Sequence, residues 1–377
     1  MEYEWIKSVA RMSDDHTSII FNHNFNRKIE PHSLPENLTS LTFGWFFDQK
    51  IEPNSLPENL TNLTFGDKFN QKIEPNSLPE NLTTLTFGDY FNQKIEPNSL
   101  PENLSTLSFE RNFNQKIEPN SLPEKLTNLT FGNHFNRKLE PNSLPENLIT
   151  LTFGYYFNQK IEPNSLPENL TNLTFGENFN QKIDPNSLPL TLTNLKFGHY
   201  FNQIIEPYTL PLTLTNLEFG HGFNQIIEPG ILPDNISYLF FGWKFNQKID
   251  IHILPKNLID LTFGFEFNQN IENILGNIEN INFDWTVLNC RCLTKNTDMI
   301  NQIPRNFNVK VFVNQNLFTG DGPKWPIYFL DYHKLSSIYK SKYDILYEYY
   351  EPRFGNMTVI INRETYEPYS YAKSACK

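Results

Sequence analysis

Several features are scarce in this sequence of 377 residues, and each scarcity argues against a class of protein. Three cysteines are too few for a disulfide framework in a chain of this size. No run reaches the roughly 18 apolar residues of a transmembrane helix, so we expect no membrane insertion. Lys and Arg number 31 against 42 Asp and Glu, and such an acidic balance does not favour binding to nucleic acid.

A secretion signal and catalytic motifs are also lacking. Met1 to Trp5 are acidic and no apolar stretch follows, so we expect a cytoplasmic protein that is not secreted. Cys290 and Cys292 lack a second pair of Cys or His ligands for a zinc site. Thr319–Pro323 predicts a turn, because no Lys-Thr follows to complete a phosphate loop. We therefore expect a non-enzymatic protein with no cofactor, no metal and no small-molecule substrate.

Phe and Pro are abundant, with 33 and 26 residues, and both recur at a fixed interval. One Phe column runs from Phe21 to Phe263 and a second from Phe25 to Phe267, each with a step of 22 residues. A period of 22 is too short for two helices and is typical of a solenoid in which each coil contains one strand and a short return. The fold class that we predict is therefore a β-rich solenoid.

The unit that contains Leu60-Thr61-Asn62-Leu63-Thr64-Phe65 shows where the strand lies. Leu63 and Phe65 alternate with Thr64, so the first two are expected to face the core and the Thr to face solvent. Equal phase in every unit predicts a parallel sheet. Two Pro columns mark the return path, which we expect to be extended or short 3₁₀ backbone. The Asn after the second Phe, replaced only by Asp48, is predicted to donate and accept hydrogen bonds with the backbone of the adjacent coil.

The two ends of the array differ from its middle. Residues 1–20 are predicted to form an N-terminal cap, with a helix in residues 2–12 that places Trp5, Ile6 and Val9 on one face. Residues 21–284 form the array, with a last strand over 278–283. Residues 285–377 carry more basic than acidic side chains, whereas residues 1–284 are strongly acidic. For this tail we predict a small α+β domain with strands over 308–313 and 358–361 and a helix over 295–303.

The repeated core Phe69-Asn70-Gln71-Lys72-Ile73-Glu74-Pro75 resembles the FNIP (IP22) repeat, and the resemblance extends over residues 16–284. It implies a leucine-rich-repeat-like, right-handed stack of 22-residue coils. Proteins of this type are numerous in social amoebae and in giant viruses of amoebae, and this chain resembles the viral members. Many relatives carry an F-box ahead of the repeats, and we expect no complete F-box here. The resemblance implies protein–protein interaction, including target recognition linked to host ubiquitin ligases.

The positions that vary between coils are the candidates for partner binding. The two residues between the Gly and the second Phe change from coil to coil and are rich in aromatic side chains, which are common interface anchors. Outward strand positions in the later coils add two more, and we expect the richest contact surface near residues 196–266. The candidates are Trp45, Phe46, Tyr90, Tyr155, Tyr156, His199, Tyr200, Tyr238, Phe240, Trp243 and Phe265.

Three functions remain open at this point. The first is an intracellular module that recognises protein partners through these varying positions. The second is a structural or virion-associated rod, because nearly identical coils also suit a spacer. The third is an enzyme within residues 285–377, although no catalytic motif supports this alternative. His199 and His221 fall on neighbouring coils and could titrate or bind a metal ion, but no Asp or Cys is placed to complete the site.

Overall fold

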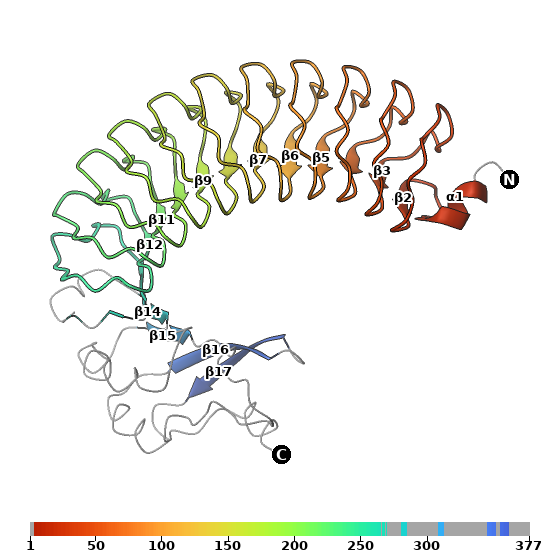
Figure 1. Ribbon diagram of the computed structural model, residues 1–377. Coiled ribbons are helices and arrows are strands. Elements are labelled where there is room, and N and C mark those ends of the chain that lie inside the picture. Colours follow the sequence, from red (N-terminus) through yellow and green to blue (C-terminus); the bar gives the residue numbers. More distant parts are fainter. Residues whose placement is uncertain are drawn as a thin grey trace, which may run out of the picture. The chain divides into compact units, whose positions relative to one another are not determined.

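A computed structural model describes residues 4–264, 266–267, 269, 280–284, 308–312, 345–351 and 355–361 (Figure 1). The chain divides into two compact units, Met1–Gly198 and His199–Lys377, each of which is described by itself. The predicted helix over 295–303, the predicted turn at 319–323 and Phe265 lie outside the described residues. The described residues are rich in strand, and their one α-helix is short.

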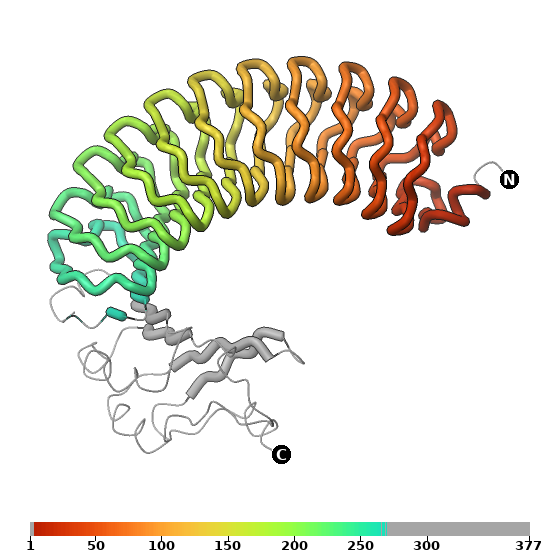
Figure 2. The backbone as a smooth tube through the Cα atoms, in the orientation of Figure 1, coloured from red at the N-terminus to blue at the C-terminus, as the bar shows by residue number. Residues whose placement is uncertain are grey.

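The first unit is a stack of coils with one short strand each (Figures 1 and 2). Strands β2 to β10 pair in parallel, each with the next, and the partners are 22 residues apart, as in the pair Leu41 and Leu63. Within this unit the strands lie along the inner edge of a curved stack. Their bounds are β2 (Ser18–Phe21), β3 (Ser40–Thr42), β4 (Asn62–Thr64), β5 (Thr84–Phe87), β6 (Thr106–Phe109), β7 (Asn128–Thr130), β8 (Thr150–Thr152), β9 (Asn172–Thr174) and β10 (Asn194–Lys196).

The N-terminal cap differs from the prediction in its second half. Helix α1 covers only Glu4–Val9, and Ala10–Met12 form strand β1, which pairs antiparallel with β2. The predicted helix over 2–12 was thus too long, because pairing with β2 satisfies the edge of the sheet. Trp5 stacks near Phe21 at a centroid distance of 6.2 Å and covers the first coil. In the following turn, hydrogen bonds from Ser13 and Thr17 lower the pKa of Asp15 to about 2.

The second unit continues the same strand pattern. Strands β11 to β16 pair in parallel in chain order, and β16 pairs antiparallel with β17. The strands predicted over 308–313 and 358–361 are present as β15 and β17, whereas β16 was not predicted. Pairing of Phe263 with Phe283 places the last repeat strand two residues early, as the sequence indicated. The bounds are β11 (Asn216–Glu218), β12 (Tyr238–Phe240), β13 (Asp260–Phe263), β14 (Asn280–Asp284), β15 (Asn308–Phe312), β16 (Ile345–Glu351) and β17 (Gly355–Ile361).

The core of each coil consists of six apolar positions that repeat along the stack. Both Phe columns are buried, and the two rings of one coil, such as Phe153 and Phe157, stack at 3.7 Å between centroids. Phe153 also stacks on Phe175 of the next coil at 5.8 Å. The core is therefore a continuous column of rings, flanked by aliphatic side chains. In one coil the six positions are Leu60, Leu63, Phe65, Phe69, Ile73 and Leu78, each no more than 5% exposed.

The Asn column stabilises contacts between coils, although in a different way from the prediction. The side-chain oxygen of Asn158 accepts a hydrogen bond from the backbone N–H of Asn180 at 2.9 Å and from the side-chain amide of Gln181 at 3.2 Å. Asp48 accepts the equivalent bond from the N–H of Asn70. In the described coils the side chains of this column accept hydrogen bonds from the next coil through their oxygen, which explains why an Asp is tolerated there.

In the coils that the structure describes, the return path contains no helix, and a turn centred on an Asn lies where extended or short 3₁₀ backbone was predicted. Asn76 has a φ of 63° in the left-handed region, and the hydroxyl of Ser77 donates to the Glu74 carbonyl at 2.8 Å. Just before this turn, Lys72 and Glu74 form an exposed ion pair at 3.6 Å. The Lys and Glu columns therefore form a surface ladder of ion pairs, each of which contributes under ~1 kcal/mol to the unfolding free energy.

Candidate functional site

The two varying residues between the Gly and the second Phe lie on a rigid backbone that follows each strand. We call them the rim pairs. Within the first unit the backbone N–H of the second residue donates to the carbonyl of the first residue of the preceding pair, as Tyr156 does to Asn133 at 2.8 Å. The bond recurs from Phe46, which donates to His23, through Asn178, which donates to Tyr155. The side chains change from coil to coil, whereas this backbone hydrogen bond recurs.

The rim pairs of the first unit carry exposed aromatic side chains, as the sequence suggested. Trp45 and Phe46 lie next to His23, which stacks on Trp45 at 5.7 Å. Tyr155 and Tyr156 contact each other edge to face at 4.8 Å. The exposed fractions are 40% for Trp45, 44% for Phe46, 44% for Tyr90, 40% for Tyr155 and 47% for Tyr156. Exposed aromatic rings on a fixed backbone can bury a large area at small entropic cost, which suits an interface.

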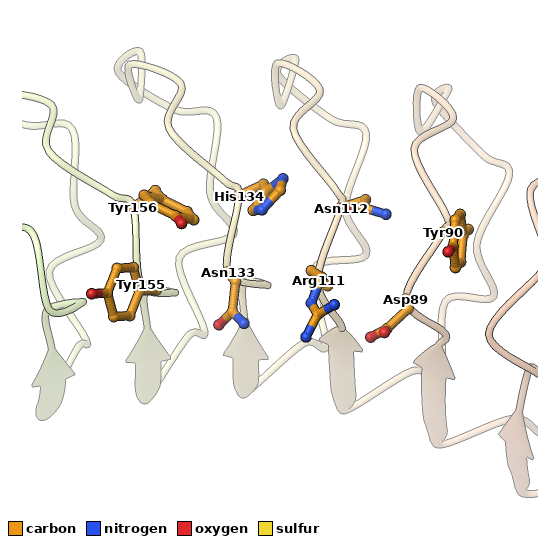
Figure 3. A pocket seen from close by; sticks show the side chains of 8 residues that line it. All are labelled: Asp89, Tyr90, Arg111, Asn112, Asn133, His134, Tyr155 and Tyr156. Carbon is orange, nitrogen blue, oxygen red and sulfur yellow. The ribbon is translucent and has the colours of Figure 1, made fainter.

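Four consecutive rim pairs of the first unit line a hollow of about 540 Å³ (Figure 3). Tyr90 lies at one end, and Tyr155 and Tyr156 lie at the other. Polar side chains lie between these rings. The lining residues are Asp89, Tyr90, Arg111, Asn112, Asn133, His134, Tyr155 and Tyr156. Three of these eight residues, Tyr90, Tyr155 and Tyr156, were candidates from the sequence. The richest contact surface had been expected in later coils, near residues 196–266.

The hollow coincides with the one break in the Gly column between residues 44 and 264. In regular coils a Cβ at this Gly would overlap the preceding coil, as at Gly66, where it would lie 1.8 Å from the Gly44 oxygen. Glu110 occupies this position between Gly88 and Gly132. Because a Cβ does not fit the regular backbone, the coil of Glu110 must turn differently.

Two observations support this altered turn. In regular coils the second Phe donates its N–H to the Gly carbonyl, as Phe91 does to Gly88 at 3.2 Å, and in the part of the chain that the structure describes Phe113 has no such bond to Glu110. Ring spacing in the first Phe column is 5.5 Å between Phe87 and Phe109 but 6.2 Å between Phe109 and Phe131. The Phe109 ring is thus shifted relative to Phe131, whereas the backbones remain close, since a Cβ at Gly132 would lie 1.2 Å from the Glu110 oxygen.

Carboxylates on three consecutive coils lie in or beside the hollow. Partial burial raises the pKa of Asp67, and the negative charge of Asp89 raises it further. The pKa of Glu110 is raised by desolvation first and then by Asp89 and Asp67. Lys68 places its Nζ 3.7 Å from the centre of the Tyr90 ring. The local charge is therefore negative, although Arg111 and Lys68 oppose it.

The rim pairs of the second unit form a compact aromatic and histidine cluster. The Nδ1 atoms of His199 and His221 are 2.9 Å apart, so the N–H of one ring donates a hydrogen bond to the ring nitrogen of the other. Trp243 stacks on His221 at 3.8 Å, and its Nε1 is buried without a hydrogen-bond partner. Tyr200 is exposed at 54% and contacts His199 edge to face at 4.8 Å. Trp243 is half-buried and presents less surface than the sequence suggested.

The remaining candidates are less accessible than the exposed rim residues. Tyr238 and Phe240 lie in β12 and are half-buried, separated by the buried Leu239. Phe265 lies outside the described residues. Among the residues that the structure describes, no group of three or more His, Cys, Asp and Glu is arranged to hold a metal ion. Nor does any helix in the described ranges have the length and apolar character needed to cross a membrane.

The sequence reasoning missed a set of exposed apolar residues in the second unit. Ile204 and Ile226 replace the Lys of the surface ladder on consecutive coils and are 59% and 61% exposed. Leu212 replaces a Glu and is 76% exposed, and Tyr208 replaces an Asn and is 86% exposed. The signal was present in the sequence as breaks in the Lys, Glu and Asn columns.

Comparison with known proteins identifies the repeat. The model of the FNIP Repeat family matches residues 17–46, 47–90, 91–134, 135–178, 179–222 and 223–266 without a gap. A search of curated proteins found no match.

Among solved structures, the chain is similar to the giant-virus protein CroV588, described as a novel circular LRR protein, with 43% identity and a TM-score of 0.63. That match covers 78% of this chain and 48% of CroV588, so the matched part is about half of that protein. An internalin, inlF, from Listeria monocytogenes matches with 17% identity and a TM-score of 0.46, over 80% of this chain and 82% of its own.

Proposed function

Because the chain belongs to the FNIP repeat family, we propose that it is a non-enzymatic module that recognises protein partners through its rim pairs. A leucine-rich-repeat-like solenoid offers a long surface on which side chains can vary without loss of the fold. The rim backbone meets this requirement, since its hydrogen bond to the preceding coil recurs within the first unit while the side chains differ.

One observation carries the proposal: exposed aromatic side chains are concentrated in the rim pairs. Tyr155 and Tyr156 are large, exposed and adjacent, and the core rings Phe153 and Phe157 hold the chain on either side of them. Neither tyrosine is part of the buried column. A chain that served only as a spacer would have no need to keep such rings in contact with solvent.

A finer proposal concerns the fate of the bound protein. Membership in the FNIP family supports a role in selecting targets for host ubiquitin ligases in the cytoplasm. This role requires a contact between the chain and a ligase component as well as a contact with the target. The two contacts can be tested separately, because only the second depends on the rim pairs under this proposal.

The test is affinity purification of the tagged chain from expressing cells, followed by mass spectrometry. Tyr155→Ala combined with Tyr156→Ala should reduce recovery of the partner at least tenfold and leave thermal unfolding unchanged. The control is Lys94→Ala combined with Glu96→Ala, which removes an exposed ion pair of the surface ladder and should leave recovery intact.

Three outcomes distinguish partner binding through the rim pairs, the ligase role and the structural rod. Equal recovery by both variants would contradict binding through this part of the rim. Recovery of ligase components by the wild type and by the tyrosine variant alike would support the ligase role. Abundance of the chain in purified virus particles, with no partner recovered from cells, would favour the structural rod instead.

A further inference from the structure

The hollow between Tyr90 and the tyrosine pair has walls that suit a cation. Lys68 already places its ammonium group over the ring of Tyr90, which demonstrates the cation–π geometry within the chain itself. At the opposite end, the rings of Tyr155 and Tyr156 are exposed and are set at 70° to each other. A cationic side chain that entered the hollow would therefore meet an aromatic ring at either end.

The charge around the hollow also favours a positive ligand. Asp89 lines the hollow, and Glu110 immediately precedes the lining residue Arg111. Asp67 lies on the coil before that of Asp89. Partial burial is the main cause of the raised pKa values of Asp67 and Glu110, and repulsion from the negative charge of Asp89 adds to it in both. A ligand cation would relieve this repulsion, whereas an anion would increase it.

The dimensions of the hollow favour an extended chain. It spans four consecutive rim pairs, and neighbouring coils are separated by about 4.8 Å, so its length is about 15 Å. An extended peptide advances about 3.3 Å per residue, so four to five residues would fill this length. Such a segment would run along the stack and cross the coils.

We propose that this hollow binds an extended segment of a partner protein that carries Lys or Arg side chains. The proposal rests on the proposed function and specifies the chemistry of the partner. Arg111 lies inside the hollow and bears the same charge as such a ligand. It therefore limits affinity and disfavours a cation at its own coil, so the favoured positions for the ligand's cations lie near Asp89 and the tyrosines.

The experiment measures fluorescence anisotropy with labelled eight-residue peptides of alternating Lys and Ser, Gln and Ser, or Glu and Ser. The Lys peptide should bind the full chain at least tenfold tighter than the Gln peptide, and the Glu peptide should not bind. Asp67→Asn combined with Asp89→Asn should weaken the Lys peptide at least fivefold. The control Glu36→Gln with Glu58→Gln removes the same charge from exposed sites elsewhere and should weaken it less than twofold.

Two substitutions at residue 110 separate the effect of the altered turn from the effect of the Glu110 charge. Glu110→Gln keeps the Cβ and the altered turn, and should weaken the Lys peptide by about threefold, the size expected for one exposed charge. Glu110→Gly restores the regular column, so it should close the hollow and weaken the peptide at least tenfold. Arg111→Gln should tighten it by about threefold because a like charge is removed.

Several results would overturn the proposal. One is tighter binding of the Glu peptide together with its loss in Arg111→Gln, and another is equal weakening by the Asp variant and the control. Failure of the proposed function looks different. In that case the peptide results hold, but the tyrosine variant recovers cellular partners as well as the wild type does.

Discussion

Residue 208 shows how one side chain can conflict with the turn that the repeat requires. Asn occupies the left-handed position of the outer turn in seven coils, with φ between 61° and 63°, and Gly230 occupies it once. Tyr208 adopts a φ of 64° there although it is bulky, and 86% of its surface is exposed. A left-handed conformation suits Asn and Gly and strains larger residues.

We therefore expect Tyr208→Asn to stabilise the chain. The free energy of unfolding should rise by about 0.5–1 kcal/mol, since strain is removed and little packing is lost. Urea denaturation followed by circular dichroism measures this change. Asn186→Tyr, the reverse substitution on the coil before, should cost a similar amount. A loss of stability in Tyr208→Asn would show that the tyrosine packs in a way that outweighs its backbone strain.

For single residues, the sequence predicted which positions contact the adjacent coil better than it predicted which atoms make the contact. The Asn after the second Phe was assigned to contacts with the adjacent coil, and Asn158 makes them by accepting two hydrogen bonds through its side-chain oxygen. The Asn of the outer turn was not interpreted. Its column contains Asn, His and Gly in addition to Tyr208, and tolerance of the left-handed region is what the first three share.

At the scale of the element, the Asn that follows the second Phe allows two substitutions that should differ in their effect on stability. Asn158→Ala removes the acceptor for the N–H of Asn180 and the amide of Gln181, and this N–H is partly buried. We expect a loss of about 1–2 kcal/mol in the free energy of unfolding. Asn158→Asp keeps the acceptor, as Asp48 does, and should cost less than half as much.

Chemical denaturation of the two variants beside the wild type tests this expectation. Hydrogen exchange of the Asn180 amide gives a local readout, because its protection should fall in the Ala variant and persist in the Asp variant. Equal destabilisation by Ala and Asp would mean that the amide donor of Asn158, and not its oxygen, stabilises the coil.

The elements themselves were largely predictable from periodicity. Alternation within each strand and the step of 22 residues between strands determine both the inward face and the parallel register, as the pairing of Leu63 with Leu85 shows. Strand β1 was not predicted, because the alternation of Ala10–Met12 is only three residues long, and these residues pair with the open edge that β2 presents. The hollow depends on how closely successive backbones approach at Glu110, and the sequence shows this only as a gap in the Gly column.

At the scale of the whole molecule, the second unit departs from the acidic and polar surface of the repeat. Ile204 and Ile226 stand where Lys residues of other coils form ion pairs, as Lys72 does with Glu74 at 3.6 Å. Each is followed two residues later by a Glu, so a Lys at these positions could form the same kind of pair. Exposed apolar residues on neighbouring coils increase the tendency of a protein to bind dyes and to self-associate.

Ile204→Lys combined with Ile226→Lys should therefore change the surface without changing the fold. Binding of the dye ANS should fall by at least half, self-association in sedimentation velocity at high concentration should decrease, and the circular dichroism spectrum should stay the same. The control Ile149→Thr removes an exposed Ile from the first unit and restores the Thr found at this position in other coils. If the control lowers ANS binding as much as the double variant, or if the double variant leaves it unchanged, the exposed isoleucines of the second unit are not the main apolar surface of this protein.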